Sequence, residues 1–164
     1  MNQLQYTNTR FDPNRTRLHD IAKDMAEAFG YTATLGIDSE LAQLLRLRVA
    51  QLNPCSYCLI LHTEAAHAAG STPAKVAHLL SWRESTLFSP ESAALEYAEM
   101  LTVFDQAGFA AAHTRMVELF DEQSIAEVAS VVINMNVWTR LKLAQGATPV
   151  TVDGRGVNDT GRHP

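Results

Sequence analysis

Apolar residues recur every three or four positions along most of this 164-residue chain, which is the spacing of helices that bury one face. Between residues 17 and 29, for example, the apolar positions are Leu18, Ile21, Met25 and Phe29. The 23 alanines and 18 leucines are strong helix formers, while β-branched and aromatic residues are sparse and scattered. No segment shows the alternating pattern of a strand ladder. The sequence therefore predicts an all-α fold.

Capping residues, prolines and glycines divide this pattern into separate helices. Thr72-Pro73 and Ser89-Pro90 each combine a capping side chain with a proline at the first helical position. Asn53-Pro54 ends one helix and begins the next, since proline fits the first turn of a helix but not its interior. Gly108 is expected to interrupt the pattern. The expected helices cover residues 17–29, 39–52, 54–69, 74–82, 91–104, a segment from Gly108 to about 120, and 125–145.

The chain has the length of a single domain. We expect a helical domain over residues 17–146, preceded by an N-terminal extension over 1–16. Residues 147–164 are expected to form a flexible C-terminal tail, because the segment TPVTVDGRGVNDTGRHP is rich in glycine and proline and has few apolar residues.

Charge and hydropathy exclude several classes of protein. Thirteen Lys and Arg against eighteen Asp and Glu give a net charge of −5, which argues against a nucleic-acid-binding face. No apolar run has the length of a membrane span, and the first residues lack the apolar core of a signal peptide. We therefore expect a cytoplasmic enzyme or binding domain.

The two cysteines of the chain form a motif with one histidine. Cys55, Cys58 and His62 are spaced three and four apart, so a helix places them on one face. A helix N-terminus favours a thiolate, and a histidine one turn below can take the thiol proton or hold the thiolate as an ion pair. An activated thiolate beside a second thiol is the equipment for dithiol redox chemistry. Which sulfur attacks is left open, because the helix terminus favours Cys55 and His62 favours Cys58.

Other interpretations of the motif are less favoured. The two cysteines can be buried structural residues. A zinc site built from Cys55, Cys58 and His62 needs a fourth ligand, for which His67 and His78 are the candidates, and a helical C-x-x-C chelates zinc poorly. A thioredoxin-like site requires a strand before the motif, and the sequence predicts none there.

Polar residues also interrupt apolar segments. Asn134, Asn136 and Arg140 lie within the last predicted helix, where we expect hydrogen bonds in the core or across an interface, because unpaired buried polar groups are costly. Trp82 is expected to pack in the core, and Arg83 to form an ion pair or an interface contact.

The segment LRLRVAQLNPCSYCLILHTEAAHAAG resembles the core of the AhpD-like alkylhydroperoxidases, a group within the carboxymuconolactone decarboxylase superfamily. The segments SWRESTLFSPESAALEYAEMLT and INMNVWTRL resemble the downstream helices of the same family, so the resemblance extends over about residues 17–146. It implies an AhpD-like bundle of about six to seven helices.

The resemblance also implies roles for the motif. Cys58 would be the peroxidatic cysteine, Cys55 the resolving cysteine and His62 part of a proton relay. No metal, haem or flavin is implied. By the same resemblance, the protein would use an external dithiol of lipoyl or thioredoxin type as its reductant. It would also assemble as a homo-oligomer, often a trimer or a hexamer in this family.

One position departs from the family pattern. The family has a glutamate twelve residues before the first cysteine, and this chain has Gln43 there. An amide can orient His62 but cannot act as a base, which a carboxylate can. Glu40 and Glu64 are candidates to supply the missing carboxylate.

The expected function is therefore a thiol-dependent peroxidase that reduces hydroperoxides through the cysteine pair. Two alternatives remain. One is a redox-responsive binding or disulfide-exchange protein on the same scaffold with little peroxidase activity. The other is an enzyme resembling the lactone decarboxylases of the superfamily.

Overall fold

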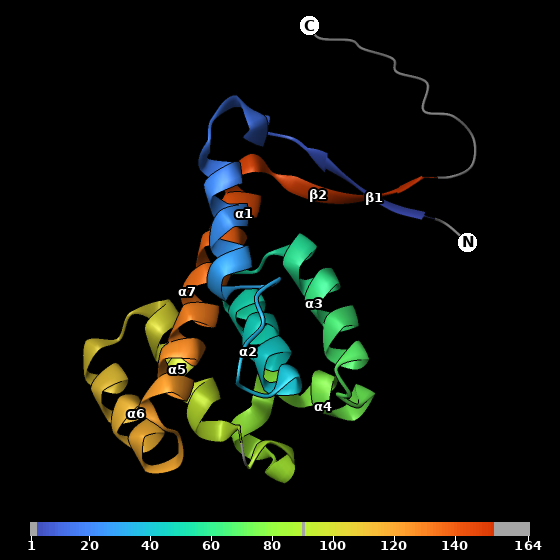
Figure 1. Cartoon of the computed structure of the whole chain (residues 1–164). Helices are drawn as coiled ribbons and strands as arrows, with labels where there is room; N and C mark the ends of the chain where they lie inside the picture. Colours follow the sequence, from blue (N-terminus) through green and yellow to red (C-terminus); the bar gives the residue numbers. More distant parts are fainter. Residues whose placement is uncertain (1–2, 90, 153–164) are drawn as a thin grey trace, which may run out of the picture.

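The computed structural model describes residues 3–89 and 91–152, and within these ranges the chain is an all-α bundle with one small two-stranded sheet (Figure 1). The helices are α1 (Leu18–Phe29), α2 (Ser39–Leu52), α3 (Ser56–Ala68), α4 (Pro73–His78), α5 (Ser92–Val103), α6 (Gln106–Leu119) and α7 (Glu122–Gln145). Short 3-10 helices cover Pro13–Arg15, Leu79–Glu84 and Thr86–Phe88, and the strands are β1 (Gln3–Asn8) and β2 (Ala147–Val152). The expected all-α bundle of about six to seven helices is confirmed.

Helix α2 lies at the centre of the bundle, where it packs against α3, α5 and α7 (Figure 1). Its residues Leu44, Leu45 and Val49 are fully buried. The same helix also buries two charged side chains, Arg46 and Arg48. Charged groups are rarely buried without a partner, so each arginine needs a specific explanation.

Side-chain caps explain where several helices begin. Asp38, Thr72, Asp105 and Asp121 each accept a hydrogen bond from the backbone N–H three residues further on, which satisfies one free donor of the first turn. The predicted cap at Ser89 is wrong: α5 begins at Ser92, and Ser89 instead ends the preceding 3-10 helix. Pro90 lies outside the described residues.

Two further helix predictions need correction. The helix expected over 74–82 ends at His78, and a 3-10 helix follows with a kink at Ser81. Gly108 does not interrupt the pattern but lies inside the first turn of α6. A Cβ atom at this position would lie 2.5 Å from Sδ of Met100 on α5, so the glycine allows the two helices to approach closely.

The expectation of a flexible tail from residue 147 is wrong over 147–152. This segment forms β2 and pairs antiparallel with β1, with Asn8 opposite Ala147 and Gln3 opposite Val152. Backbone hydrogen bonds from Thr9 to Gly146 and from Arg10 to Gln145 continue the pairing into the end of α7. The remainder of the expected tail, 153–164, lies outside the described residues. The two-stranded ribbon extends from the bundle beside the start of α3, which β2 contacts (Figure 1).

None of the helices in the described ranges combines the length and the apolar character that a bilayer crossing requires.

Candidate active site

The turn between α2 and α3 positions the two cysteines. Cys55 is the N-cap residue of α3 rather than part of its first turn, and its Sγ accepts a hydrogen bond from the backbone N–H of Cys58 at 3.4 Å. The preceding Asn53 donates through Nδ2 to Asn136 and Thr139 of α7, both at 2.9 Å. These contacts hold the turn, and with it the first cysteine, against α7.

The two thiols are buried and in direct contact. The Sγ atoms of Cys55 and Cys58 lie 2.7 Å apart, and both cysteines are free rather than disulfide-bonded. The hydrogen bond from the Cys58 thiol lowers the pKa of Cys55, although burial opposes this effect. The same sulfur contact, together with burial, raises the pKa of Cys58. The pair can therefore lose one proton readily and shares the remaining proton between two adjacent sulfurs.

Lys142, in the last turn of α7, supplies a positive charge near both sulfurs. This charge lowers the pKa of Cys55 and counteracts the upward shift of Cys58. The ammonium lies 4.6 Å from the ring centroid of Tyr57 and 5.6 Å from that of Trp138, and its own pKa is lowered by burial. The sequence motif does not include this residue. Its one local signal is a lysine four positions after Trp138 on the apolar side of a helix.

His62 is buried on α3 and is held by Gln43 of α2. The Nδ1 atom of the imidazole lies 3.0 Å from Oε1 of Gln43, so Nδ1–H donates to the amide oxygen and Nε2 carries the free lone pair. Burial, and then the charge of Arg46, lowers the pKa of His62 to about 3. The imidazole is therefore neutral near pH 7, which does not fit the expected ion pair with a thiolate.

Neither alternative carboxylate reaches this histidine. Glu40 pairs with Lys75, its Oε1 lying 3.1 Å from Nζ, and accepts a hydrogen bond from Ser71 at 2.9 Å. Glu64 is exposed on α3. Among the described residues, Gln43 is the hydrogen-bond partner of the His62 ring.

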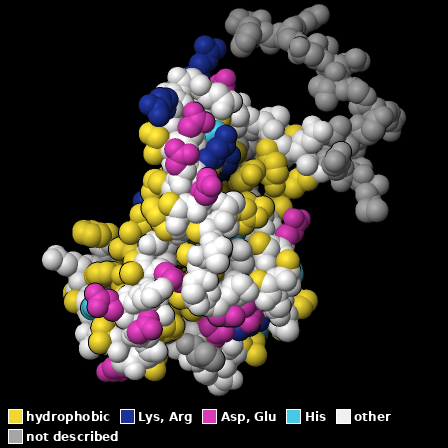
Figure 2. Space-filling model, viewed as in Figure 1, with side chains coloured by type: hydrophobic (Ala, Val, Ile, Leu, Met, Phe, Trp, Pro, Cys, Tyr) yellow, Lys and Arg dark blue, Asp and Glu magenta, His cyan; other side chains and the backbone are white. Residues whose placement is uncertain are grey.

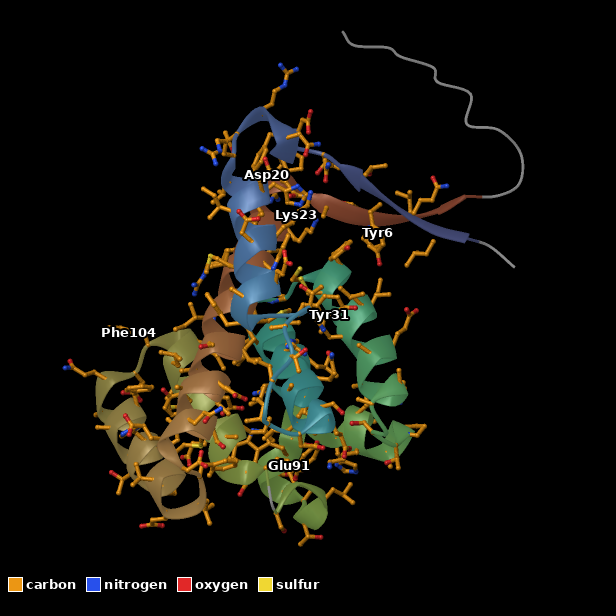
Figure 3. All side chains as sticks on the ribbon, viewed as in Figure 1. Tyr6, Asp20, Lys23, Tyr31, Glu91 and Phe104 are labelled. Atoms are coloured by element: carbon orange, nitrogen blue, oxygen red, sulfur yellow. The ribbon has the colours of Figure 1, made fainter. Side chains whose placement is uncertain are left out.

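A cavity of about 500 Å³ opens beside the motif. It is enclosed mainly by α1, α3 and α7 and by the loop after α1, from which Tyr31 extends toward α3 (Figure 3). Cys58 and His62 line this cavity, whereas Cys55 lines a separate, smaller hollow of about 150 Å³ under the start of β2. Tyr6 of β1 packs on Tyr57 of α3, with ring centroids 4.5 Å apart, so the ribbon covers the tyrosine between the two cysteines (Figure 3).

Residues 20–100 match the family described as the carboxymuconolactone decarboxylase family. The uncharacterized protein YdfG of Bacillus subtilis (strain 168) is 30% identical over 126 residues, covering 76% of this chain and 86% of that protein. The chain belongs to the carboxymuconolactone decarboxylase family. The uncharacterized protein YnjA of Escherichia coli (strain K12) is 33% identical over 110 residues, covering 66% of this chain and 60% of YnjA.

Solved structures share the fold of this carboxymuconolactone decarboxylase family member. A protein of unknown function from Agrobacterium tumefaciens, ATU0492, named as a candidate antioxidant defence protein AhpD, superposes with a TM-score of 0.69 at 18% identity. It covers 82% of this chain and 90% of its own. An uncharacterized peroxidase-related protein from Silicibacter sp. TM1040 gives a TM-score of 0.65 at 18% identity, covering 80% and 69%.

The remaining residues that the sequence singled out make contacts of other kinds. In the described part of the chain, no group of three or more His, Cys, Asp and Glu side chains is placed to hold a metal ion, and His67 bonds the carbonyl of Ser71. Arg83 forms the expected ion pair, with Glu99. Asn136 is hydrogen-bonded in the core as expected, but Nδ2 of Asn134 is buried without a partner among the described residues.

Proposed function

We propose that the protein is a thiol-dependent peroxidase that reduces hydroperoxides through Cys58 and Cys55. The observation that carries the proposal is the position of Cys58, which lines a cavity together with His62 while its sulfur contacts that of Cys55 at 2.7 Å. A hydroperoxide bound in this cavity can reach the sulfur of Cys58, which is in contact with the sulfur of Cys55. The family membership and the fold shared with peroxidase-related proteins support the same chemistry.

The reaction begins with the thiolate that the pair shares. The proton between the two sulfurs moves to Cys55, and the Cys58 thiolate attacks the terminal oxygen of the hydroperoxide. The O–O bond breaks, giving a sulfenic acid on Cys58 and an alkoxide, which takes up a proton and leaves as the alcohol. The Cys55 thiol then attacks the Cys58 sulfur, and a disulfide forms with loss of water. An external dithiol reduces the disulfide and closes the cycle.

His62 serves this cycle as a neutral proton carrier. Gln43 fixes Nδ1 as the protonated nitrogen, so Nε2 has the lone pair that accepts a proton. Burial makes this imidazole a weak base, and the amide adds no charge to strengthen it. We therefore expect a slower proton transfer than a carboxylate partner would allow.

The proposal also covers the reductant, the cellular location and the assembly of the protein. The reductant would be a lipoyl- or thioredoxin-type dithiol, and the protein would act in the cytoplasm as a homo-oligomer, a trimer or a hexamer. The family resemblance suggests this assembly, and exposed apolar residues on α5, α6 and α7 are consistent with it.

Rapid-mixing oxidation of the reduced protein by an organic hydroperoxide tests the proposal. We expect wild-type protein to form the Cys55–Cys58 disulfide, identified by mass spectrometry. Cys58→Ser should lose hydroperoxide consumption, and Cys55→Ser should accumulate a sulfenic acid on Cys58. Full activity in Cys58→Ser would show that the assignment of the two roles is wrong. Oxidation of the wild type at the rate of a free thiol would contradict peroxidase function.

One observation favours a second candidate. Because Gln43 replaces the family glutamate, the pair is suited to disulfide exchange or redox sensing, which need no peroxide-activating base. Rapid oxidation by a small disulfide, combined with slow oxidation by hydroperoxides, would support this alternative. A decarboxylase of the kind in the family name would retain activity after alkylation of both thiols, whereas either redox function would be lost.

A further inference from the structure

Two arginines on α2 are buried, but only one of them is neutralised. Arg48 is 8% exposed, and its Nε lies 2.6 Å from a carboxylate oxygen of Glu99. Arg46 is 5% exposed, yet no carboxylate within the described ranges forms an ion pair with it. Its one hydrogen bond there runs from Nη2 to the carbonyl oxygen of Gly30, at 2.9 Å. Arg46 lines the cavity that Cys58 also lines.

A second polar residue lines the same cavity, and it carries an unpaired donor. Asn134 is 3% exposed, and its Nδ2 is buried without a hydrogen-bond partner among the described residues. The amide of Asn134 packs so closely on Gly30 that a Cβ atom at this glycine would overlap it. The Asn134 atoms nearest to that position are Oδ1 and Cγ, and Arg46 donates to the carbonyl oxygen of the same glycine, so both side chains lie against Gly30.

The remaining lining of the cavity has an excess of positive charge. Lys23 and Lys142 line it with Arg46, against the single carboxylate of Glu27. His62 and His19 also line it, and burial lowers the pKa of each imidazole. The other lining is apolar or aromatic and includes Leu61, Met135 and Trp138. The cavity is thus an apolar chamber with cationic and donor groups, and at about 500 Å³ it has the volume of small-molecule sites.

We propose that this cavity binds an organic carboxylate, and that the substrate of the proposed peroxidase is a hydroperoxide whose carboxylate is held by Arg46 and Asn134. The planar guanidinium matches a carboxylate with two parallel N–H donors, and the amide N–H of Asn134 supplies a third. The apolar body of the acid lies against Leu61 and Trp138, which directs its hydroperoxide group to Cys58. Burial lowers the pKa of Arg46 to about 10, so an anion beside it relieves the cost of the buried charge.

The inference about the substrate rests on the proposed function, but binding of the carboxylate does not. Calorimetric titration of the reduced wild-type protein with 4-phenylbutyrate and with its neutral amide therefore tests the site alone. We expect the carboxylate to bind at least about 10-fold more tightly than the amide, since hydrogen bonds to charged groups contribute more than those to neutral ones. Equal binding of the two probes, or binding of neither, would overturn the proposal.

Variants of the cavity residues show which side chain confers the preference for the carboxylate over the amide. Arg46→Met, which keeps the side-chain length, should abolish the preference for the carboxylate, and Arg46→Lys should restore part of it. Arg115→Met, which removes an exposed arginine of α6 paired with Glu96, should bind both probes as the wild type does. If Arg46→Met does not fold, Asn134→Asp decides: a carboxylate placed in the cavity should weaken binding of the acid and leave the amide unaffected. A folded Arg46→Met variant that keeps the preference contradicts the assignment.

Kinetics with a hydroperoxy acid and its methyl ester separate the two proposals. For the wild type we expect kcat/KM to favour the acid by at least about 10-fold, and for Arg46→Met the ratio should fall toward one. Carboxylate-selective binding with no oxidation of the cysteines by either compound would refute the peroxidase and retain the site. Equal reduction of both compounds, without selective binding, would refute the site and retain the peroxidase.

Discussion

Gln43 lies at the position where the resemblance to the AhpD-like family leads us to expect a glutamate, and its amide oxygen lies 3.0 Å from Nδ1 of His62. A carboxylate in this place would accept the same hydrogen bond and add a negative charge, which stabilises a protonated imidazole. We therefore predict that Gln43→Glu raises the pKa of His62 and increases the rate of hydroperoxide reduction near pH 7 by about 10-fold or more. Steady-state kinetics across the pH range measure both effects.

The matched control for this substitution is Gln43→Leu, which removes the hydrogen bond without adding a charge. This variant should be slower than the wild type, because His62 loses the partner that fixes its tautomer. An unchanged rate in Gln43→Glu would show that proton transfer to His62 does not limit turnover.

Lys142 supplies the charge that lowers the pKa of Cys55. We predict that Lys142→Met slows oxidation of the pair near pH 7 several-fold and moves the pH dependence of that oxidation to higher pH, because the thiolate fraction falls. Lys142→Arg keeps the charge and should behave like the wild type. The rate of thiol alkylation as a function of pH measures the effect directly. If Lys142→Met had the wild-type pH profile, the hydrogen bonds to Cys55 would account for the thiolate without this charge.

Residues of the site differ in how far sequence could identify them. Cys55, Cys58 and His62 share one helix, so their spacing alone places them together. Gln43 and the motif residues lie on adjacent helices, and only the family pattern connects them. Arg46 and Lys142 enter the site through the packing of α2 and α7. Nothing local distinguishes Arg46 from other basic residues, and Lys142 has only its spacing from Trp138.

At the scale of elements, Glu99 ties α5 to α2 and to the 3-10 helix over 79–84. It accepts hydrogen bonds from Arg48, Trp82 and Arg83. Burial pushes the pKa of Glu99 upward, but these donors outweigh burial and hold the pKa below its usual range. A carboxyl whose pKa is depressed in the folded state stabilises the fold above its unfolded pKa, and this stability is lost as the pH falls through the folded value.

We predict that Glu99→Gln lowers the free energy of unfolding by about 3–5 kcal/mol near neutral pH, because it leaves Arg48 buried without its counter-charge. The difference from the wild type should begin to shrink as the pH falls below about 4.3, the pKa of an unfolded glutamate, and should be lost below the lower folded pKa, where the wild-type carboxyl is protonated in both states. Urea unfolding at several pH values measures it. Glu96→Gln, which breaks a more exposed pair with Arg115, should cost at most about 1 kcal/mol. A difference independent of pH would contradict the argument.

The helices could be predicted from sequence, and the strands could not, for a physical reason. Helical periodicity and caps such as Asp38 and Asp121 are local signals, and they give most of the observed boundaries. Strands β1 and β2 each have their partner at the opposite end of the chain, with Asn8 paired to Ala147. No local pattern reports such a pairing, and the short segment after Gly146 reads as a loop when considered alone.

At the scale of the whole molecule, the surface of the bundle carries apolar side chains that a monomer would leave in water. They include Val103, Phe104, Val117, Leu119 and Ile133, from the ends of α5 and α6 and from α7. Figure 2 shows hydrophobic side chains gathered at the edge of the molecule around Phe104, which Figure 3 labels. Exposed large apolar side chains of this kind are typical of protein–protein contacts, and the proposed homo-oligomer would cover them.

Phe104 is the most informative residue of this surface. It is 81% exposed and has the left-handed backbone conformation, with φ of 56°, which costs an L-residue about 1–2 kcal/mol. Glycine adopts this conformation without the cost, so Phe104→Gly should leave the isolated subunit at least as stable as the wild type. We predict that the same substitution weakens assembly and shifts the protein toward monomers. Phe104→Leu, which keeps both an apolar side chain and the strain, should assemble like the wild type.

Sedimentation equilibrium over a range of concentrations distinguishes these outcomes, because the apparent mass reports assembly and is independent of peroxidase activity. Thermal unfolding of the monomeric fraction measures the stability of the subunit separately. A wild-type protein that sediments with the mass of one chain at every concentration would contradict the oligomer. If Phe104→Gly assembled as the wild type does, the interface would lie elsewhere on the bundle. The strained conformation of this residue would then need an explanation other than subunit contact.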